Sequence, residues 1–192
     1  TLDRSSAASD VYKRQMLLHH ARRASRTRAD GSLVPLAEQD RSRWDAALIA
    51  EGVQVLQAAL ARDRLGEFQA QAAVAALHAD ARRAEETDWA QIVGWYDELL
   101  RLTGSPVVAL NRAVAIGEAD GAPAGLAALS SVDPGLPRYA AAAAHLHEKA
   151  GDRPAAARLY AEASRSAPNL AERNHLARQA ARIGQELRDG AG

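Results

Sequence analysis

The sequence has no cysteine and few aromatic residues, and both absences narrow the possible folds. Without cysteine, disulfide bonds and thiolate metal sites are excluded, which fits a reducing cytoplasm. Aromatic residues make up 4% of the chain while alanine dominates the apolar set, a composition that suits closely packed helices better than sheets. These absences favour an all-α fold.

The sequence also lacks net charge and long apolar runs. Its 24 Lys and Arg residues balance 24 Asp and Glu residues, so no overall charge draws the chain to nucleic acid or to an anionic membrane. No apolar run reaches the length of a membrane span, and residues 1–15 are too polar for a secretion signal. We therefore expect a cytoplasmic protein without a membrane partner.

Residues 105–169 contain two related segments that predict stacked helix pairs. Gly117 and Gly151 lie 34 residues apart, and Pro134 and Pro168 repeat that spacing. This is the period of tetratricopeptide repeats, which consist of two antiparallel helices, a tight turn and a proline after the second helix. The segments predict a tetratricopeptide-like antiparallel helix-pair stack, an α-solenoid.

The second segment fits this pattern better than the first. Ala156, Tyr160 and Ala163 are spaced i, i+4, i+7, so they share one helix face. The two alanines let the paired helix approach closely, and Tyr160 is expected to fill the gap between neighbouring pairs. In the first segment, Leu126 and Leu129 occupy the places of Tyr160 and Ala163.

The predicted organisation is one repeat domain with short flanking segments. We expect a non-native or disordered leader at residues 1–15, a linker with a short helix at 16–39, the helical repeat domain at 40–187 and a disordered tail at 188–192. The longest helix is predicted at residues 40–61, with Asp40 or Ser42 as its cap. Further helices are predicted at residues 67–83, 89–102, 107–119, 123–131, 138–150, 153–167 and 170–187.

Three stretches of the chain carry a family resemblance. They are MLLHHARRASRTRADGSLVPLAEQDRSRWDAALIAEG, WYDELLRLTGSPVVALNRAVAIGEADG and the repeat that ends in LYAEASRSAPN. Their order and spacing over residues 16–183 resemble the C-terminal extension of bacterial extracytoplasmic-function sigma factors. The stretch Glu38-Gln39-Asp40-Arg41 is similar to a family motif whose first residue is usually Asp, and Glu keeps its charge.

The resemblance implies promoter-specific transcription initiation for a longer protein, and a regulatory role for this part. Family members carry two helical domains before this region, which bind the polymerase core and the promoter elements and are absent from this sequence. The implied partners are proteins: the sigma core domains, RNA polymerase or a regulatory protein. Promoter DNA is implied as a partner only through the missing domains, and neither a cofactor nor enzymatic activity is implied.

A groove lined by the first helix of each pair is the first candidate site. Asn111 is a poor helix former that needs a hydrogen-bond partner, and in a tetratricopeptide domain an Asn in this column can hold a peptide backbone. His145 occupies the same column one repeat later, and Arg138, Glu148 and Lys149 are expected to face the same groove. The alternative is that Asn111 bonds an adjacent helix or loop.

The residues Gln39, Asp40, Arg41 and Trp44 form the second candidate site, which follows an extended segment. These residues could contact the sigma domains or polymerase. Alternatively, they form a helix cap and an ion pair, with Trp44 in the core.

Other patterns give weaker signals. Neighbouring histidines such as His145 and His147 diverge on a helix and no carboxylate completes a set, so no metal site is expected. Arginines clustered at residues 22–28 could contact DNA phosphate, or could belong to a solvated helix end or an inter-domain linker. A stand-alone protein-binding scaffold unrelated to transcription remains an alternative. An enzyme is a weaker one, because no phosphate loop, nucleophile elbow or paired carboxylates occur.

Overall fold

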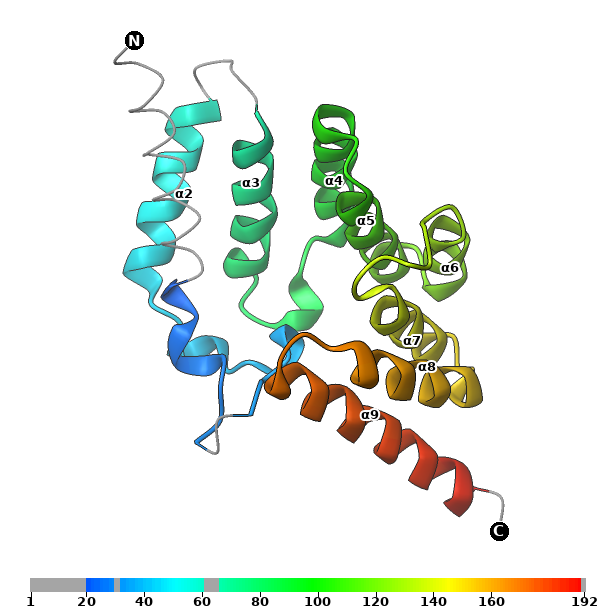
Figure 1. The fold of residues 1–192 in the computed structure, drawn as a ribbon. Helices are drawn as coiled ribbons and strands as arrows, with labels where there is room; N and C mark the ends of the chain where they lie inside the picture. The colour runs from blue at the N-terminus through cyan, green and yellow to red at the C-terminus, as the bar shows by residue number, and fades with distance from the viewer. Residues whose placement is uncertain (1–19, 30–31, 61–65, 191–192) are drawn as a thin grey trace. The chain divides into compact units, whose positions relative to one another are not determined.

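The computed structural model of the chain describes residues 20–29, 32–60 and 66–190, and every regular element among them is a helix (Figure 1). Contacts divide the chain into two compact units: unit 1 comprises Thr1–Arg28 and Val34–Gly104, and unit 2 comprises Ala29–Leu33 and Ser105–Gly192. The repeat domain predicted at residues 40–187 runs through both units. The predicted leader at residues 1–15 lies outside the described residues.

Unit 1 combines short 3₁₀ helices (η) with three described α-helices. In chain order they are η1 (Arg23–Ser25), η2 (Leu36–Glu38), η3 (Arg41–Arg43), α2 (Ala46–Leu60), α3 (Glu67–Asp80), η4 (Ala84–Glu86) and α4 (Trp89–Thr103). Helix α2 packs on α3, and α3 packs on α4. Leu56 and two alanines of α3 form the core between α2 and α3, with Trp95 of α4 packed against it.

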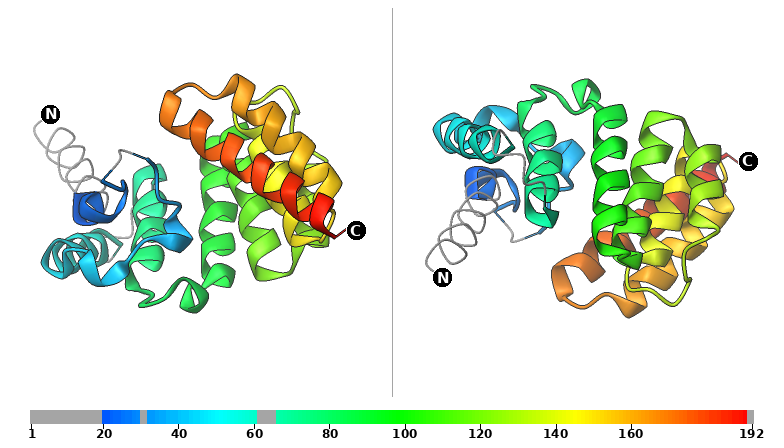
Figure 2. Two further views of the ribbon diagram at one scale, coloured as in Figure 1. Left: turned by 90° about the horizontal axis from the view of Figure 1, so that it is seen from below. Right: turned by 90° about the horizontal axis from the view of Figure 1, so that it is seen from above.

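Unit 2 is the predicted stack of antiparallel helix pairs. Its helices are α5 (Pro106–Ala119), α6 (Ala122–Leu129), α7 (Tyr139–Lys149), α8 (Arg153–Ser166) and α9 (Leu170–Asp189). Each helix packs on the next, α5 also contacts α7, and Figure 2 shows α9 lying along α8. As predicted, Ala156, Tyr160 and Ala163 are buried together, where they pack with Leu176 and Ile183 of α9.

Local side chains set most of the helix starts. Asp88, Asp152 and Asn169 each place a side-chain oxygen on a backbone N–H of the first turn of α4, α8 and α9, as good N-cap residues do. Proline stands in the first turn of α5, α6 and α8, where its missing N–H costs no helical hydrogen bond. Helix α9 continues to Asp189, into the predicted disordered tail.

The helix predicted at residues 40–61 begins later than expected. Asp40 caps the short helix η3, where its Oδ1 accepts the Ser42 N–H at 3.0 Å. Asp45 then begins α2, accepting the N–H groups of Ala47 and Leu48 at 3.0 and 3.1 Å. Trp44 is therefore outside α2, and α9, at 20 residues, is longer than α2 at 15.

The glycine spacing also needs correction. The turn glycines are Gly121 and Gly151, whose φ angles of 94° and 81° suit a residue without a side chain. Gly117 lies inside α5, where it faces Gly125 of α6. A Cβ atom on Gly117 would lie 2.2 Å from Cδ2 of Leu146, so a glycine here lets three helices meet closely. The 34-residue spacing of Gly117 and Gly151 therefore does not mark equivalent turns.

Candidate functional site

In unit 2, Arg138 is one of the predicted groove residues. It lies just before α7 and is held by α9. Its guanidinium donates from Nε and Nη2 to the two carboxylate oxygens of Glu172, at 2.9 and 3.1 Å. Arg138 has a φ angle of 70°, a conformation that costs a bulky residue roughly 1 kcal/mol or more. This two-pronged ion pair joins the start of α7 to α9, which are the first helices of successive pairs.

His145 and Lys149 of α7 both bind Glu118 of α5. His145 Nε2 donates to Glu118 Oε1 at 2.6 Å, and Lys149 Nζ donates to Oε2 at 2.7 Å. The hydrogen bond from His145, followed by that from Lys149, lowers the pKa of Glu118 to about 2, although partial burial opposes the shift. Glu118 is therefore ionised at neutral pH and joins α5 to α7.

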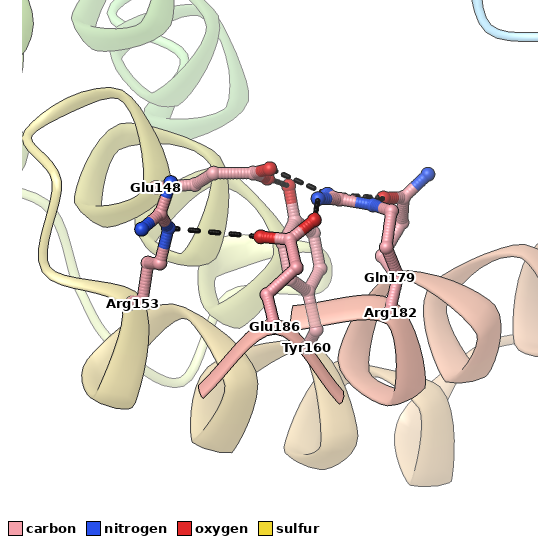
Figure 3. Close-up of polar contacts among 6 residues, drawn as sticks. All are labelled: Glu148, Arg153, Tyr160, Gln179, Arg182 and Glu186. Atoms are coloured by element: carbon pink, nitrogen blue, oxygen red, sulfur yellow. Dashed lines mark hydrogen bonds and ion pairs between the residues drawn. The ribbon is translucent and has the colours of Figure 1, made fainter. Parts of the chain in front are cut away.

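Glu148, the next predicted groove residue, joins α7 to α8 and α9 (Figure 3). Its carboxylate accepts the Tyr160 hydroxyl at 2.9 Å and Arg182 Nη2 at 2.5 Å. Arg182 also donates to Glu186, which lies 3.6 Å from Arg153 of α8. Burial first, and then the charge of Glu148, raise the pKa of the Tyr160 hydroxyl, so it remains a proton donor.

Asn111 differs from the other predicted groove residues. Its side chain is exposed on α5, and no hydrogen bond joins it to another described residue. The structure thus brings Arg138, His145, Glu148 and Lys149 into ion pairs between helices and leaves the amide of Asn111 on the surface.

The partners Glu118, Glu172 and Arg182 were not among the predicted site residues. Two of them carried a signal, because Glu172 follows Arg138 by 34 residues and Arg182 follows Glu148 by the same interval. Opposite charges 34 residues apart therefore indicate ion pairs between the first helix of one pair and the first helix of the next.

In unit 1, the second candidate site centres on Trp44, which is 7% exposed. Its indole Nε1 donates to the hydroxyl of Ser25 at 2.7 Å, and that hydroxyl donates to the Arg22 carbonyl at 3.1 Å. The guanidinium carbons of Arg41 and Arg22 lie 4.8 and 5.8 Å from the ring centroid, within the range of cation–π attraction.

The side chain of Arg41 caps the C-terminal end of helix α3. Its Nη1 donates to the carbonyls of His78 and Ala81, at 2.7 and 2.6 Å, so it caps carbonyls that have no partner within the helix. The helix stops at Asp80, whereas the sequence predicted an end at residue 83. Burial lowers the pKa of Arg41, and the charges of nearby glutamates oppose this effect.

His78 is half-buried beside this cap. Its ring meets Trp89 edge-on, with centroids 5.2 Å apart. Burial first, and then the charges of Arg22 and Arg41, lower the pKa of His78 to about 4, so the ring is neutral at pH 7. His78 Nδ1 and Arg41 Nε are buried without a hydrogen-bond partner among the described residues.

The remaining predicted residues of the second site make local contacts. Gln39 Nε2 donates to the Val34 carbonyl at 3.1 Å, and exposed Asp40 caps η3. Together with Arg41 and Trp44, they fold the segment before α2 onto the end of α3. No sequence spacing pointed to the contact between Arg41 and α3, which joins residues 37 positions apart.

Two absences concern only the described part of the chain. No cluster of three or more His, Asp or Glu side chains there could hold a metal ion. None of the helices in these ranges combines the length and apolar character needed to span a bilayer.

Comparisons with known proteins find a family and a relative. Residues 15–60 match the model of a family described as a family of unknown function, DUF6596. The chain is 44% identical over 124 residues to the uncharacterized protein R00370 of Rhizobium meliloti (strain 1021), an alignment that covers 65% of this chain. The matched part spans only 29% of that relative's length. No solved structure matches the chain.

Proposed function

We propose that the chain is a regulatory, non-catalytic, protein-binding domain of an alternative sigma factor. The proposal is carried by three stretches whose order and spacing over residues 16–183 resemble the C-terminal extension of extracytoplasmic-function sigma factors. The full protein directs promoter-specific initiation of transcription in the cytoplasm. In this role, promoter DNA and the polymerase core are bound by domains outside this chain.

Two features of the molecule support a protein-binding role. Stacked helix pairs present extended surfaces to partners. The equal numbers of positive and negative residues also suit a protein partner better than a nucleic acid.

The proposed domain biases whether the sigma factor engages a promoter, by binding the sigma domains, polymerase or a regulatory protein. Asn111 is the candidate contact, because its exposed amide can both donate to and accept from a peptide backbone. Arg138, His145, Glu148 and Lys149 already bind partners within unit 2. In this proposal these four residues hold the helices that form the binding surface in place. They do not bind the partner directly through unpaired charges.

The Rhizobium meliloti relative offers a test in a longer protein. Three proteins would be compared in run-off transcription with purified core RNA polymerase: the full relative, the relative without its aligned segment, and a chimera with this chain in that place. We expect the full relative to start transcription at defined promoters, the deletion to change that activity, and the chimera to restore it. A full relative that neither binds core polymerase nor starts transcription would contradict the proposal and favour a stand-alone scaffold.

A pair of variants tests the proposed contact. In the chimera, Asn111→Ala should weaken the regulatory effect while leaving the melting temperature unchanged. Asn174→Ala, at an exposed site on α9, is the matched control. Equal regulation by both variants would remove Asn111 from the contact surface.

A further inference from the structure

Unit 1 has an open pocket. One side is formed by η3 and the first half of α2, and the other side by the end of α3. Its volume is about 660 Å³. Pockets that hold small molecules measure roughly 300–1,000 Å³, so the space is large enough for a ligand.

The wall formed by α2 is apolar except for Gln54 at its end. Ala46, Ile49, Ala50 and Val53 follow one another at helical spacing and line the pocket together. Ile49 and Val53 remain half-buried, and Ala50 is exposed. A strip of partly exposed apolar side chains beside a concave space favours a ligand with an apolar body.

Two cationic side chains also line the pocket. Arg41 and Arg82 line it from different elements, against the single carboxylate of Asp80. Helix α3 ends here, and the negative end of its dipole is already compensated by the bonds from Arg41 to two of its last carbonyls. Arg82 is exposed. The lining of the pocket thus combines two cationic side chains with an apolar strip.

We propose that this pocket binds a small amphipathic organic anion. An aromatic or alkyl body would lie on the strip from Ala46 to Val53, and a carboxylate or sulfonate would lie between Arg41 and Arg82. Guanidinium groups match such anions because their planar N–H donors pair with two oxygens at once. The inference does not rest on the proposed sigma function, since binding is measured on the chain alone.

The first test compares three probes of one shape and different charge. The whole chain would be titrated in a calorimeter with 2-naphthoate, 2-naphthylmethanol and 2-naphthylmethylammonium. We expect saturable, one-to-one binding of naphthoate, about tenfold tighter than the alcohol, with the ammonium weakest of the three. Absence of saturable naphthoate binding, or equal binding of the ammonium, would overturn the proposal.

The second test places the site by matched variants. Ala50→Trp fills the pocket, whereas Ala47→Trp adds the same bulk at an exposed position of α2 outside the lining. We expect Ala50→Trp to weaken naphthoate binding at least about tenfold and Ala47→Trp to change it less than about twofold.

A charge pair provides an independent readout. Arg82→Glu reverses a charge of the lining, and Arg43→Glu reverses an exposed charge outside it. We expect Arg82→Glu, but not Arg43→Glu, to weaken naphthoate binding. If circular dichroism shows that Ala50→Trp does not fold, the comparison of these two charge variants tests the site instead. Equal affinities of Arg82→Glu and Arg43→Glu would place the ligand elsewhere and refute the proposed site.

Discussion

The contacts that stabilise unit 1 differ in kind from those that stabilise unit 2. In unit 2, successive helices pack as antiparallel pairs, and ion pairs such as Arg138–Glu172 join first helices one repeat apart. In unit 1, the contacts around Trp44 and Arg41 join segments that share no common spacing. In the repeat of unit 2, similar contacts recur from one helix pair to the next. In unit 1, a few side chains each contact several segments of the chain.

Removing Trp44 should therefore have the largest effect. Trp44→Ala deletes a buried indole and leaves the Ser25 hydroxyl without its donor, so we expect a loss of about 3–5 kcal/mol in the free energy of unfolding. Hydrogen exchange during denaturant titration would measure it, with the loss of protection concentrated in unit 1.

Two variants sharpen this result. Trp44→Phe keeps the apolar ring but not the N–H, and should lose only about 1–2 kcal/mol. Tyr160→Ala removes the aromatic residue between α7, α8 and α9, and its loss of protection should concentrate in unit 2. The same pattern of exchange in Trp44→Ala and Tyr160→Ala would show that the two units do not differ in this way.

The close helix crossing in unit 2 should be the next most sensitive point. A Cβ atom on Gly125 would lie 2.7 Å from the backbone Cα of Gly117 and 2.8 Å from Cδ2 of Leu146. Gly125→Ala should therefore lower the free energy of unfolding by about 2–3 kcal/mol, measured by urea denaturation.

Gly94→Ala provides the control for this substitution. Gly94 lies in α4, and apart from its chain neighbours and the backbone of its own helix no atom of the described residues lies within 4 Å of the position that a Cβ atom would take there. Alanine at this position should therefore stabilise the helix by about 0.5–1 kcal/mol. Destabilisation by both substitutions would point to a general effect of the methyl group and not to the crossing at Gly125.

The difference between the units also explains what could be predicted. The helix pairs of unit 2 were predictable because burial of Ala156, Tyr160 and Ala163 follows the helical period. The caps at Asp88 and Asn169 were predictable because they act within one helical turn.

The start of α2 was not predictable in this way. Asp40 and Asp45 are equally good cap residues by type, and each begins a helix, η3 or α2. Arg41, between them, reaches the end of α3, a contact over 37 residues that leaves no local signal. In the candidate site of unit 2, the ion pairs at one-repeat spacing were predictable in principle, whereas the link from His145 to Glu118 falls at 27 residues, outside that spacing.

The units should also lose stability in different pH ranges, with the larger change in unit 1. The pKa of His78 falls from 6.5 to about 4 on folding, so the unfolded chain binds the proton more readily. This contribution is complete above pH 6.5 and is lost as the pH falls toward 4, by roughly 2 kcal/mol. His78→Leu should flatten the pH dependence of urea unfolding in this range. An unchanged slope in His78→Leu would contradict burial of a neutral ring.

In unit 2 the corresponding group is Glu118. Its pKa is lowered from 4.5 to about 2, so its contribution is present above pH 4.5 and is lost as the pH falls toward 2. Because His145 is partly exposed, solvent screens the pair, and Glu118→Gln should lower stability at pH 7 by roughly 1 kcal/mol. Thermal unfolding at pH 7 and pH 3 measures the effect, and the difference between the variant and the parent should be smaller at pH 3, where part of the contribution is lost. A constant difference at both values would assign the loss to packing and not to charge.

The smallest effect is expected at Arg138, where two contributions oppose each other. Arg138→Ala loses the exposed ion pair with Glu172 but keeps the strained φ angle, so it should lower stability by up to about 1 kcal/mol. Arg138→Gly loses the same ion pair but removes the strain, because glycine adopts a φ of 70° readily. We therefore expect the glycine variant to match or exceed the parent in melting temperature and the alanine variant to fall below it. If alanine were the more stable of the two, the backbone at φ 70° would cost alanine less than glycine loses in conformational entropy on folding, and strain would not set the stability at this helix start.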